Sequence, residues 1–301
     1  MAFASPVAKG MTRAEAMQAI GRVCLERFVA QTEIIVARRA PAGVHQARVA
    51  MRRLRAAMSL FKPLLADAQS RRVNGELWTI ASELGKARDL DVMLKRLREL
   101  EFPGRIDLTP LLARLEEDRE QAYDKAAAML APHRLDPVVL ETATWVERGD
   151  WLNGADKAQI KARGKAVEGF AEDELDRRTR TLRKALKKLD HFDDAERHRV
   201  RIKAKKVRYG AEFFTPLAEG KEGHRAAKAF VGALKPLQDC LGGLNDIVTS
   251  GRMLRDAGRS NALVGFAAGA AADEIERTKD DLLRGATKAA EDFVEAKLFL
   301  D

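Results

Sequence analysis

The sequence predicts an all-α protein because of its composition, its few helix breakers and its hydrophobic periodicity. Among 301 residues there are only 9 prolines and 21 glycines, while the helix-favouring Ala, Leu, Glu, Arg and Lys are abundant. No segment shows the strict apolar–polar alternation of a β-strand. Hydrophobic residues make up 46% of the chain, which is enough for a folded core and excludes wholesale disorder.

The expected helices have recognisable start and stop signals. Thr12 and Glu15 form the pattern of a capping box, which predicts the start of the first helix. Pro41 and Gly43 end that helix near residue 39. The remaining helices are expected at about 44–66, 68–84, 86–101, 108–131, 137–148, 157–189, 193–218, 222–241, 243–257 and 260–299.

A glycine-containing segment at 147–156 predicts a linker or an exposed corner near the middle of the chain. We therefore expect a first helical bundle over residues 12–150, a second over 151–301, and a linker or disordered N-terminus over 1–11. No stretch approaches the ~18 uncharged apolar residues of a membrane span, and the N-terminus lacks the pattern of a signal peptide. The 2 cysteines fit a reduced, cytoplasmic compartment better than a disulfide framework.

Basic residues are concentrated in two blocks that contain no acid. Residues 34–66 hold seven Arg and Lys without any Asp or Glu, and residues 197–211 also hold seven. The two blocks carry +14, which leaves −5 for the rest of a chain whose net charge is +9. Because a solvated helix surface normally mixes both signs, two acid-free blocks indicate a polyanionic partner.

The two blocks belong to an internal repeat. At a constant offset of 153 residues, His45, Arg48, Arg52, Arg53, Arg55, Phe61, Pro63 and Leu64 match His198, Arg201, Lys205, Lys206, Arg208, Phe214, Pro216 and Leu217. A second motif, Leu84-Gly85-x-x-Arg88-Asp89, recurs as Leu241-Gly242-x-x-Asn245-Asp246 at an offset of 157. A repeat of this length predicts two similar helical bundles rather than a solenoid of short units.

Helical spacing places most of these cations on one stripe beside an apolar face. At about 100° per residue, the first stripe contains His45, Arg48, Arg52, Arg55 and Lys62, and the second contains His198, Arg201, Lys205 and Arg208. Arg53 and Lys206 project off the stripe, at about 80° from its histidine, toward a neighbouring groove or toward solvent. The large apolar residues fall on the adjacent flank, as expected for a core-facing helix.

A stripe of like charges is destabilising unless an anion neutralises it. A chain of phosphates suits this need, since each guanidinium can donate two hydrogen bonds to a phosphate and each lysine adds a point charge. His45 and His198 head the two stripes. They can donate a further bond when protonated, or they can pack as neutral residues against a neighbouring helix.

Four segments of the chain resemble signature segments of CHAD domains, the conserved histidine α-helical domains. They are residues 44–55 and 84–92 in the first half, and 198–209 and 237–242 in the second. The resemblance covers nearly the whole chain from about residue 12. It implies an all-α fold of two pseudo-symmetric four-helix bundles with a basic groove between or along them, and binding of inorganic polyphosphate through that basic surface.

The resemblance and the stripes together give the expected polyphosphate-binding residues: His45, Arg48, Arg52, Arg53, Arg55, Lys62, Arg88, His198, Arg201, Lys205, Lys206 and Arg208. The expected role is a non-catalytic targeting or regulatory module, with no metal and no cofactor. Expected partners are inorganic polyphosphate itself, polyphosphate granules, or a CYTH-type (triphosphate-tunnel) domain. Such a domain precedes CHAD in some family members, and residues 1–11 are too short to hold one.

Two other functions stay open on the sequence alone. A sequence-nonspecific nucleic-acid binder would use the same cations on the phosphate backbone, although residues 44–60 and 197–208 contain no aromatic side chain for base stacking. A metal-dependent phosphohydrolase would draw on His45, His198, Asp89, Asp91 and Asp246. The chain lacks the His-Asp pair, the His-x-x-x-His spacing and the Gly-rich loop typical of such sites, so we expect no enzyme.

Overall fold

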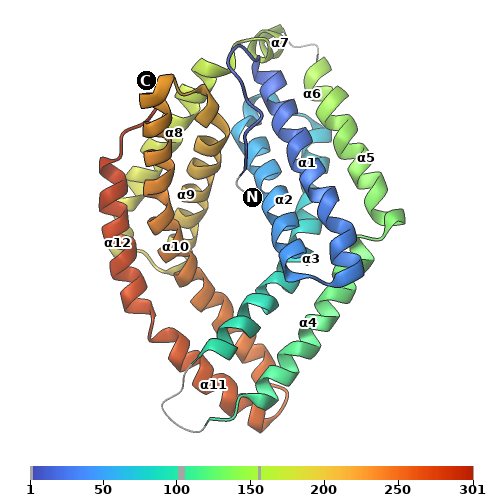
Figure 1. Ribbon diagram of the computed structural model, residues 1–301, viewed down its shortest axis with the longest axis vertical. Helices are drawn as coiled ribbons and strands as arrows, with labels where there is room; N and C mark the ends of the chain where they lie inside the picture. The colour runs from blue at the N-terminus through green and yellow to red at the C-terminus, as the bar shows by residue number, and fades with distance from the viewer. Residues whose placement is uncertain (1–2, 101–105, 155–156, 301) are drawn as a thin grey trace.

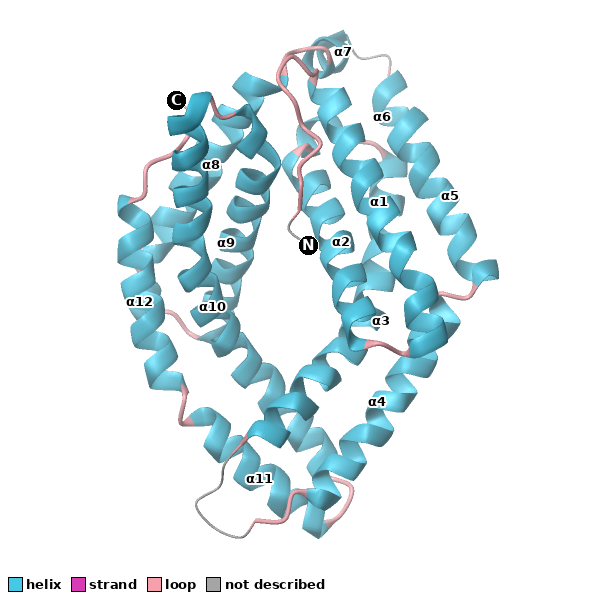
Figure 2. Cartoon of the chain, in the orientation of Figure 1, coloured by secondary structure: helices cyan, strands magenta, loops and turns pink. Residues whose placement is uncertain are grey.

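The computed structural model describes residues 3–100, 106–154 and 157–300, and in these ranges it is built from helices without any strand (Figure 2). The helices of the first half are α1 (Arg13–Arg38), α2 (Pro41–Leu60), α3 (Ala68–Glu99), α4 (Thr109–Met129), α5 (Pro132–Arg148) and α6 (Asp150–Asn153). Those of the second half are α7 (Lys157–Arg163), α8 (Val167–Leu186), α9 (Asp194–Phe214), α10 (Gly220–Gly258), α11 (Ala262–Glu276) and α12 (Lys279–Glu295). Three 3₁₀ turns are η1 (Lys62–Leu64), η2 (Leu189–His191) and η3 (Thr215–Leu217). The all-α prediction is confirmed.

Side-chain caps fix the starts of α1, α3 and α9. Thr12 and Glu15 form the predicted capping box: the Thr12 hydroxyl accepts from the backbone N–H of Glu15 at 3.2 Å, and the Glu15 carboxylate accepts from that of Thr12 at 2.7 Å. Asp193 and Glu196 build the same box at the start of α9. Asp67 caps α3 through the N–H of Ser70 at 2.7 Å.

Two predicted helix breaks are wrong, because α3 and α10 run without interruption through the glycines of the second repeat motif. Gly85 and Gly242 lie inside these helices. A glycine in a helix interior costs only about 0.5–1 kcal/mol relative to alanine, and buried leucines on either side outweigh that cost. Conversely, the single helices expected at 157–189 and 260–299 are each divided in two. The parts of our predictions that fall on residues 1–2, 101–105, 155–156 and 301 lie outside the described residues.

The helices surround two hydrophobic cores. In Figure 1, α8, α9 and α12 lie on the left, and α1, α2 and α5 lie on the right. The smaller core is formed by α8, α9, α12 and the N-terminal part of α10. The larger is formed by α1 to α5, by the first turn of α8, and by the C-terminal part of α10 with α11, which packs on α4. α10 therefore contributes to both cores. The predicted boundary at 150/151 and the internal repeat stay predictions, and the larger core draws residues from both sides of that boundary.

Residues 3–11, expected to be a linker or disordered, are instead packed between the two halves. Val7 is only 3% exposed, and the Phe3 ring packs edge-on against Phe213 at 5.6 Å between centroids. The Ser5 hydroxyl donates to the Phe213 carbonyl at 2.6 Å. Three apolar side chains, Phe3, Val7 and Met11, anchor this segment to the core, and three such residues are too weak a signal to distinguish it from a linker in the sequence.

The C-terminal ends of α2 and α9 are held together by an aromatic cluster. Phe61 stacks on Phe170 at 4.8 Å and meets Phe214 edge-on at 6.4 Å. Phe61 and Phe214 are fully buried, and they are the two phenylalanines that the repeat aligns. This contact fixes the spacing of α2 and α9, and therefore the spacing of the two basic stripes.

No helix in the described ranges is long and apolar enough to cross a bilayer.

Candidate anion-binding groove between α2 and α9

A groove of about 650 Å³ lies where α2, η1 and the start of α3 face the middle of α9. We call it the central groove. Its cationic lining residues are Arg52, Arg55, Lys62, Arg71, Arg201, Lys205 and Lys206, and its other lining residues are Ala56, Met58, Ser59, Leu65, Ser70, Asn74, Ile202 and Tyr209. Among the described residues that line it, no carboxylate is present. Both predicted stripes therefore meet in a single cavity.

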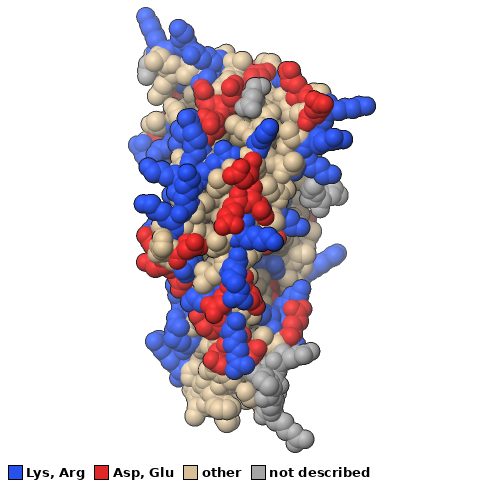
Figure 3. All heavy atoms as spheres, turned by 90° about the vertical axis from the view of Figure 1, so that its left-hand side faces the viewer, with Lys and Arg blue, Asp and Glu red and all other residues tan. Residues whose placement is uncertain are grey.

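The seven cations of the central groove form no ion pair with any carboxylate in the described part of the chain. None of them has a carboxylate oxygen within the 4.0 Å of an ion pair, whereas ion pairs are frequent elsewhere. The face that carries α8 and α12 mixes Lys and Arg with Asp and Glu over most of its height (Figure 3). Nε of Arg52 and Nε of Arg201 are buried and, among the described residues, find no hydrogen-bond acceptor. A buried donor of this kind needs an acceptor from water or from a bound anion.

Burial and mutual repulsion act on the charges of the groove. Burial first, and then the charges of Arg201 and Arg52, lower the pKa of Lys205 from its ordinary value of 10.5 to about 7. Burial also lowers the pKa of Arg201, with Arg52 adding to the effect. The lowered pKa values mean that the protonated side chains are destabilised in the free protein, and that a bound anion would stabilise them.

The cationic surface continues from the central groove along α2 toward α3 and α10. We call this region, which contains His45, Arg48, Arg88, Asp89 and Asp246, the inner extension. Burial lowers the pKa of Arg48, and the charges of Arg52, Arg88 and Arg201 act in the same direction. Arg88 lies on α3, so cations of three helices approach one another. Asp89 and Asp246 lie in the same region, and their negative charges act on Arg48 and Arg201 respectively. The carboxylates of the inner extension thus give partial counter-charge to its own cations and, through Asp246, to Arg201 of the central groove.

Arg53 and Arg208 do not line the central groove, because Glu212 holds both. Nη2 of Arg53 lies 2.7 Å from one carboxylate oxygen, and Nε of Arg208 lies 2.8 Å from the other. Arg53 also stacks over the Phe3 ring at 4.5 Å, and Nη1 of Arg208 donates to Gln238 at 3.1 Å. These two predicted site residues therefore join α2, α9 and α10 and share a single counter-charge, the Glu212 carboxylate.

The two histidines that head the stripes have different surroundings. His45 is half-buried in the inner extension, where burial, and then the charges of Arg88, Arg52 and Arg48, lower its pKa. His198 is exposed, and its Nδ1 lies 2.6 Å from Oδ1 of Asn245 on α10. The structure brings His45 close to the cations and uses His198 to tie α9 to α10.

With this geometry in place, comparison with known families is decisive. The family model described as CHAD domain matches residues 19–255, most of the chain. The chain belongs to the CHAD family. Among solved structures, it is similar to the CHAD domain from the plant Ricinus communis, with 27% identity, a TM-score of 0.77, and coverage of 97% of this chain and 95% of that one.

A second solved structure shows the same fold. PptA from Streptomyces chartreusis is 16% identical, with a TM-score of 0.67 and coverage of 93% of this chain and 99% of that one. Curated protein sequences gave no significant match. The CHAD assignment confirms the resemblance seen in the four signature segments, and the matched range includes all twelve predicted site residues.

One cation of this CHAD groove was missed by sequence reasoning. Arg71 enters the groove from the first turn of α3, where Asp67 and Ser70 form the helix cap. It lies outside both basic blocks and belongs to no repeat motif. The packing of α3 on α2 brings it into the same cavity as Lys62 and Lys206, so no spacing in the sequence signals its role.

Gly85 of the CHAD motif is explained by Arg48. Nη1 of Arg48 donates to the Ala81 carbonyl at 2.7 Å, and in doing so passes over Gly85 so closely that a β-carbon there would collide with the guanidinium. The corresponding Gly242 in α10 has open space around it. Gly85 therefore leaves room for the guanidinium of Arg48, a predicted site cation. The same glycine had suggested a helix break in the sequence.

Alanine at these two glycines should have opposite effects. Gly85→Ala displaces the Arg48 guanidinium from Ala81 and loses a charge-assisted hydrogen bond, while Gly242→Ala only gains helix propensity. We expect the unfolding free energy of Gly85→Ala to lie about 1–2 kcal/mol below that of Gly242→Ala, measured by urea denaturation. Equal stabilisation of both variants would contradict the assigned role of Gly85.

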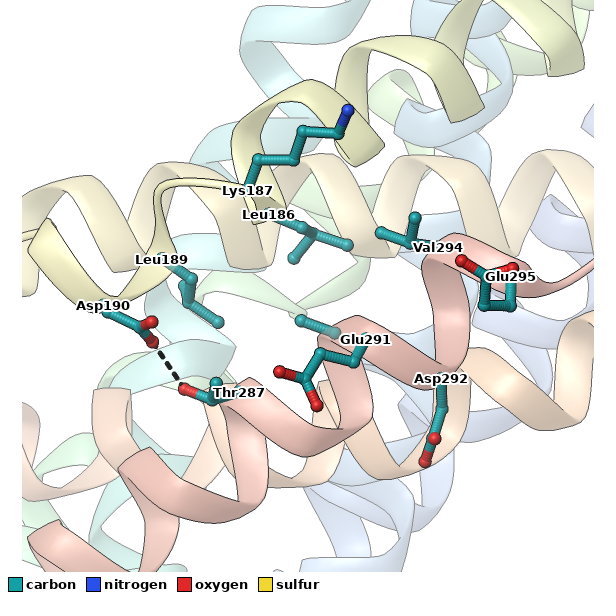
Figure 4. A pocket seen from close by; sticks show the side chains of 10 residues that line it. Leu186, Lys187, Leu189, Asp190, Thr287, Glu291, Asp292, Val294 and Glu295 are labelled. Carbon is teal, nitrogen blue, oxygen red and sulfur yellow. Dashed lines mark hydrogen bonds between the residues drawn. The ribbon is translucent and has the colours of Figure 1, made fainter.

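Another pocket differs from the CHAD groove in charge. It lies between α12 and the end of α8, has a volume of about 540 Å³, and is lined by Asp190, Glu291, Asp292 and Glu295 besides apolar residues and Lys187 (Figure 4). Asp190 accepts from the Thr287 hydroxyl at 2.7 Å. Its four carboxylates disfavour a phosphate ligand, in contrast to the carboxylate-free lining of the central groove. The described residues contain no cluster of three or more His, Cys, Asp or Glu that could hold a metal ion.

Proposed function

We propose that this CHAD protein binds inorganic polyphosphate in the central groove and does not act on it chemically. One observation carries the proposal: seven cations from α2, η1, α3 and α9 line one cavity without a carboxylate among its described lining residues. Concentrating like charge in a partly buried cavity costs free energy, and a protein keeps such an arrangement where a polyanion offsets it. A polyphosphate chain supplies one charge per unit along its length.

The side chains divide the work of binding. Arg52, Arg55 and Arg201 present planar guanidinium groups that can each donate paired hydrogen bonds to a phosphate. Lys62 and Lys206 are exposed and add charge at the mouth of the groove. Because α2 and α9 are joined at Phe61 and Phe214, the donors are held at fixed separations before the ligand arrives, which lowers the entropic cost of binding.

The lining supports binding rather than hydrolysis. The central groove offers guanidinium, ammonium, hydroxyl and amide donors, and no carboxylate or histidine of its described lining is available to activate water. The polyphosphate granules and the CYTH-type domain named above would present or use the same polyphosphate chains, and they stay expectations of the family resemblance.

A competition titration tests the proposal. We expect long-chain polyphosphate to displace a fluorescent polyphosphate probe at a far lower concentration, per phosphate, than duplex DNA does. The groove is lined by groups that donate hydrogen bonds to phosphate, and Tyr209 is the single aromatic residue of its described lining that could stack on a base. Equal competition by DNA would favour the nucleic-acid alternative. Release of inorganic phosphate on addition of divalent metal would favour the phosphohydrolase and overturn the non-catalytic part of the proposal.

Affinity should depend on pH through Lys205 and His45. Both have pKa values lowered in the free protein, Lys205 to about 7. A bound polyanion favours their charged forms and raises both pKa values, so the complex holds more protons than the free protein. Affinity must therefore rise as pH falls from 9 toward 6, by up to about tenfold for each unit by which binding raises a pKa.

The groups that face Lys205 are Arg201 on its own helix, Arg52 and Arg48 on α2, and Asp246 on α10. Dissociation constants measured at constant ionic strength with long chains, whose terminal phosphates contribute little, check this expectation. Lys205→Arg keeps the charge at every pH and should flatten the profile above pH 7. A profile that is flat in the unaltered protein would remove both residues from the site.

A further inference from the structure

Lys205 occupies a position in the central groove that suits a chemical reaction as well as ion binding. Its amine lies in a half-buried part of the cavity, with Arg201 one turn earlier on α9 and Arg52 across the groove on α2. No hydrogen-bond or ion-pair partner for its Nζ is found among the described residues. The amine therefore has no ion-paired carboxylate, and the charge of Asp246 only partly offsets the effects of burial and of the neighbouring cations.

The same surroundings make the amine a nucleophile. Desolvation and neighbouring cations are the two conditions that activate lysine in proteins, and both act here, lowering the pKa of Lys205 to about 7. A far larger fraction of this amine is then neutral at neutral pH than of a lysine at its ordinary pKa. Burial also lowers the pKa of the neighbouring Lys206, though its shift is smaller and the residue is exposed.

We propose that Lys205 is a site of covalent acylation by small acyl phosphates, whose phosphate group docks on Arg52 and Arg201. The inference rests on the proposed function only in that the central groove accepts phosphate groups. The neutral Nζ attacks the acyl carbon, and a nitrogen–carbon bond forms as the bond between that carbon and the phosphate oxygen breaks. Inorganic phosphate leaves, the nitrogen gives up one proton to solvent, and the lysine becomes an amide. The two guanidinium groups stabilise the charge of the leaving phosphate.

Acylation would regulate the groove that it modifies. The amide carries no charge and cannot regain one at low pH, so a cation that faces Arg52 and Arg201 is lost. We expect the acylated protein to bind polyphosphate about tenfold more weakly, the typical effect of losing one charge-assisted contact. Polyphosphate already in the groove should in turn protect Lys205, because it covers the amine and returns it to the ammonium form.

The test uses the unaltered full chain and acetyl phosphate at pH 7.5, with acetylation of each lysine followed over time by peptide mass spectrometry. Lys205 should be modified roughly tenfold faster than Lys62 and Lys206 in the same groove, and faster than Lys203, which lies on the same helix outside its lining. Excess pyrophosphate should slow the reaction at Lys205 and leave the rate at Lys203 unchanged. Acetic anhydride, which has no phosphate to dock, should show less preference for Lys205.

Even modification of all four lysines, or a rate at Lys205 that pyrophosphate does not alter, would overturn the proposal. Binding of polyphosphate to the unmodified protein is measured in parallel, so that failure of the acylation proposal can be distinguished from failure of the proposed function. Tight polyphosphate binding without preference for Lys205 removes the acylation site alone. Selective, pyrophosphate-sensitive acetylation without polyphosphate binding retains the acylation site and removes the proposed function.

Discussion

Removing two cations from either wall of the central groove should weaken binding of long polyphosphate by about 30- to 1,000-fold. The two variants are Arg52→Ala with Arg55→Ala on α2, and Arg201→Ala with Lys205→Ala on α9. Each pair loses charge-assisted hydrogen bonds, which together contribute about 2–4 kcal/mol. Because both walls line one cavity, we expect losses of similar size, measured by isothermal titration calorimetry.

The matched control lies on the same helix as the second variant. Arg197→Ala with Arg199→Ala also removes two positive charges from α9, but these arginines pair with Asp194 and Glu196 and lie outside the groove lining. We expect a change of less than about threefold, since only long-range charge is lost. An equal loss in the control would mean that affinity follows net charge. A loss confined to one wall would mean that a single half of the protein binds.

Salt should weaken binding steeply. Each cation that contacts a phosphate releases counterions, so the logarithm of affinity is expected to fall with the logarithm of salt concentration with a slope steeper than about −3. Between 50 and 200 mM salt this corresponds to a loss of about sixty-fold or more. Titrations of one chain length at several salt concentrations give the slope directly. A nearly flat dependence would exclude the seven unpaired cations as the main source of affinity.

The stripes themselves could be predicted from the sequence. The spacing of Arg52 and Arg201 on their helices, and the absence of acids around them, place them on a common polar flank, and both line the groove. Pro41 at the start of α2 and the capping box at Asp193 mark where the two stripe-bearing helices begin. Local rules suffice where a residue's role depends on its own helix.

Contacts between helices could not be predicted in the same way. Arg55 and Arg208 are equivalent in the repeat and share an angle on the helix, yet Arg55 lines the groove and Arg208 is paired with Glu212. The difference comes from the acid: the residue equivalent to Glu212 in the first half is Ser59. The spacing of four between Arg208 and Glu212 was a visible signal of this pairing. The capture of Arg53 by the same carboxylate, across the interface, was not.

Arg53 and Lys206 are a second pair of equivalent residues with different surroundings. They are equivalent in the repeat and both project off the stripe, but Lys206 lines the groove whereas Arg53 is covered by Phe3 and paired with Glu212. The N-terminal segment that brings Phe3 here has no counterpart in the repeat. The N-terminal segment and Glu212, neither of which has a counterpart in the other half of the repeat, thus make the two walls of the groove unequal.

The position of a bound chain tests the central claim most directly. A crystal structure of the protein with polyphosphate of defined length should show phosphates between α2 and α9, within hydrogen-bond distance of Arg52 and Arg201 at once, with Arg53 and Arg208 still paired with Glu212. Phosphates found along another surface, or along the cations of one half only with Nε of Arg52 and of Arg201 left without an acceptor, would contradict the assignment of the central groove as the polyphosphate site.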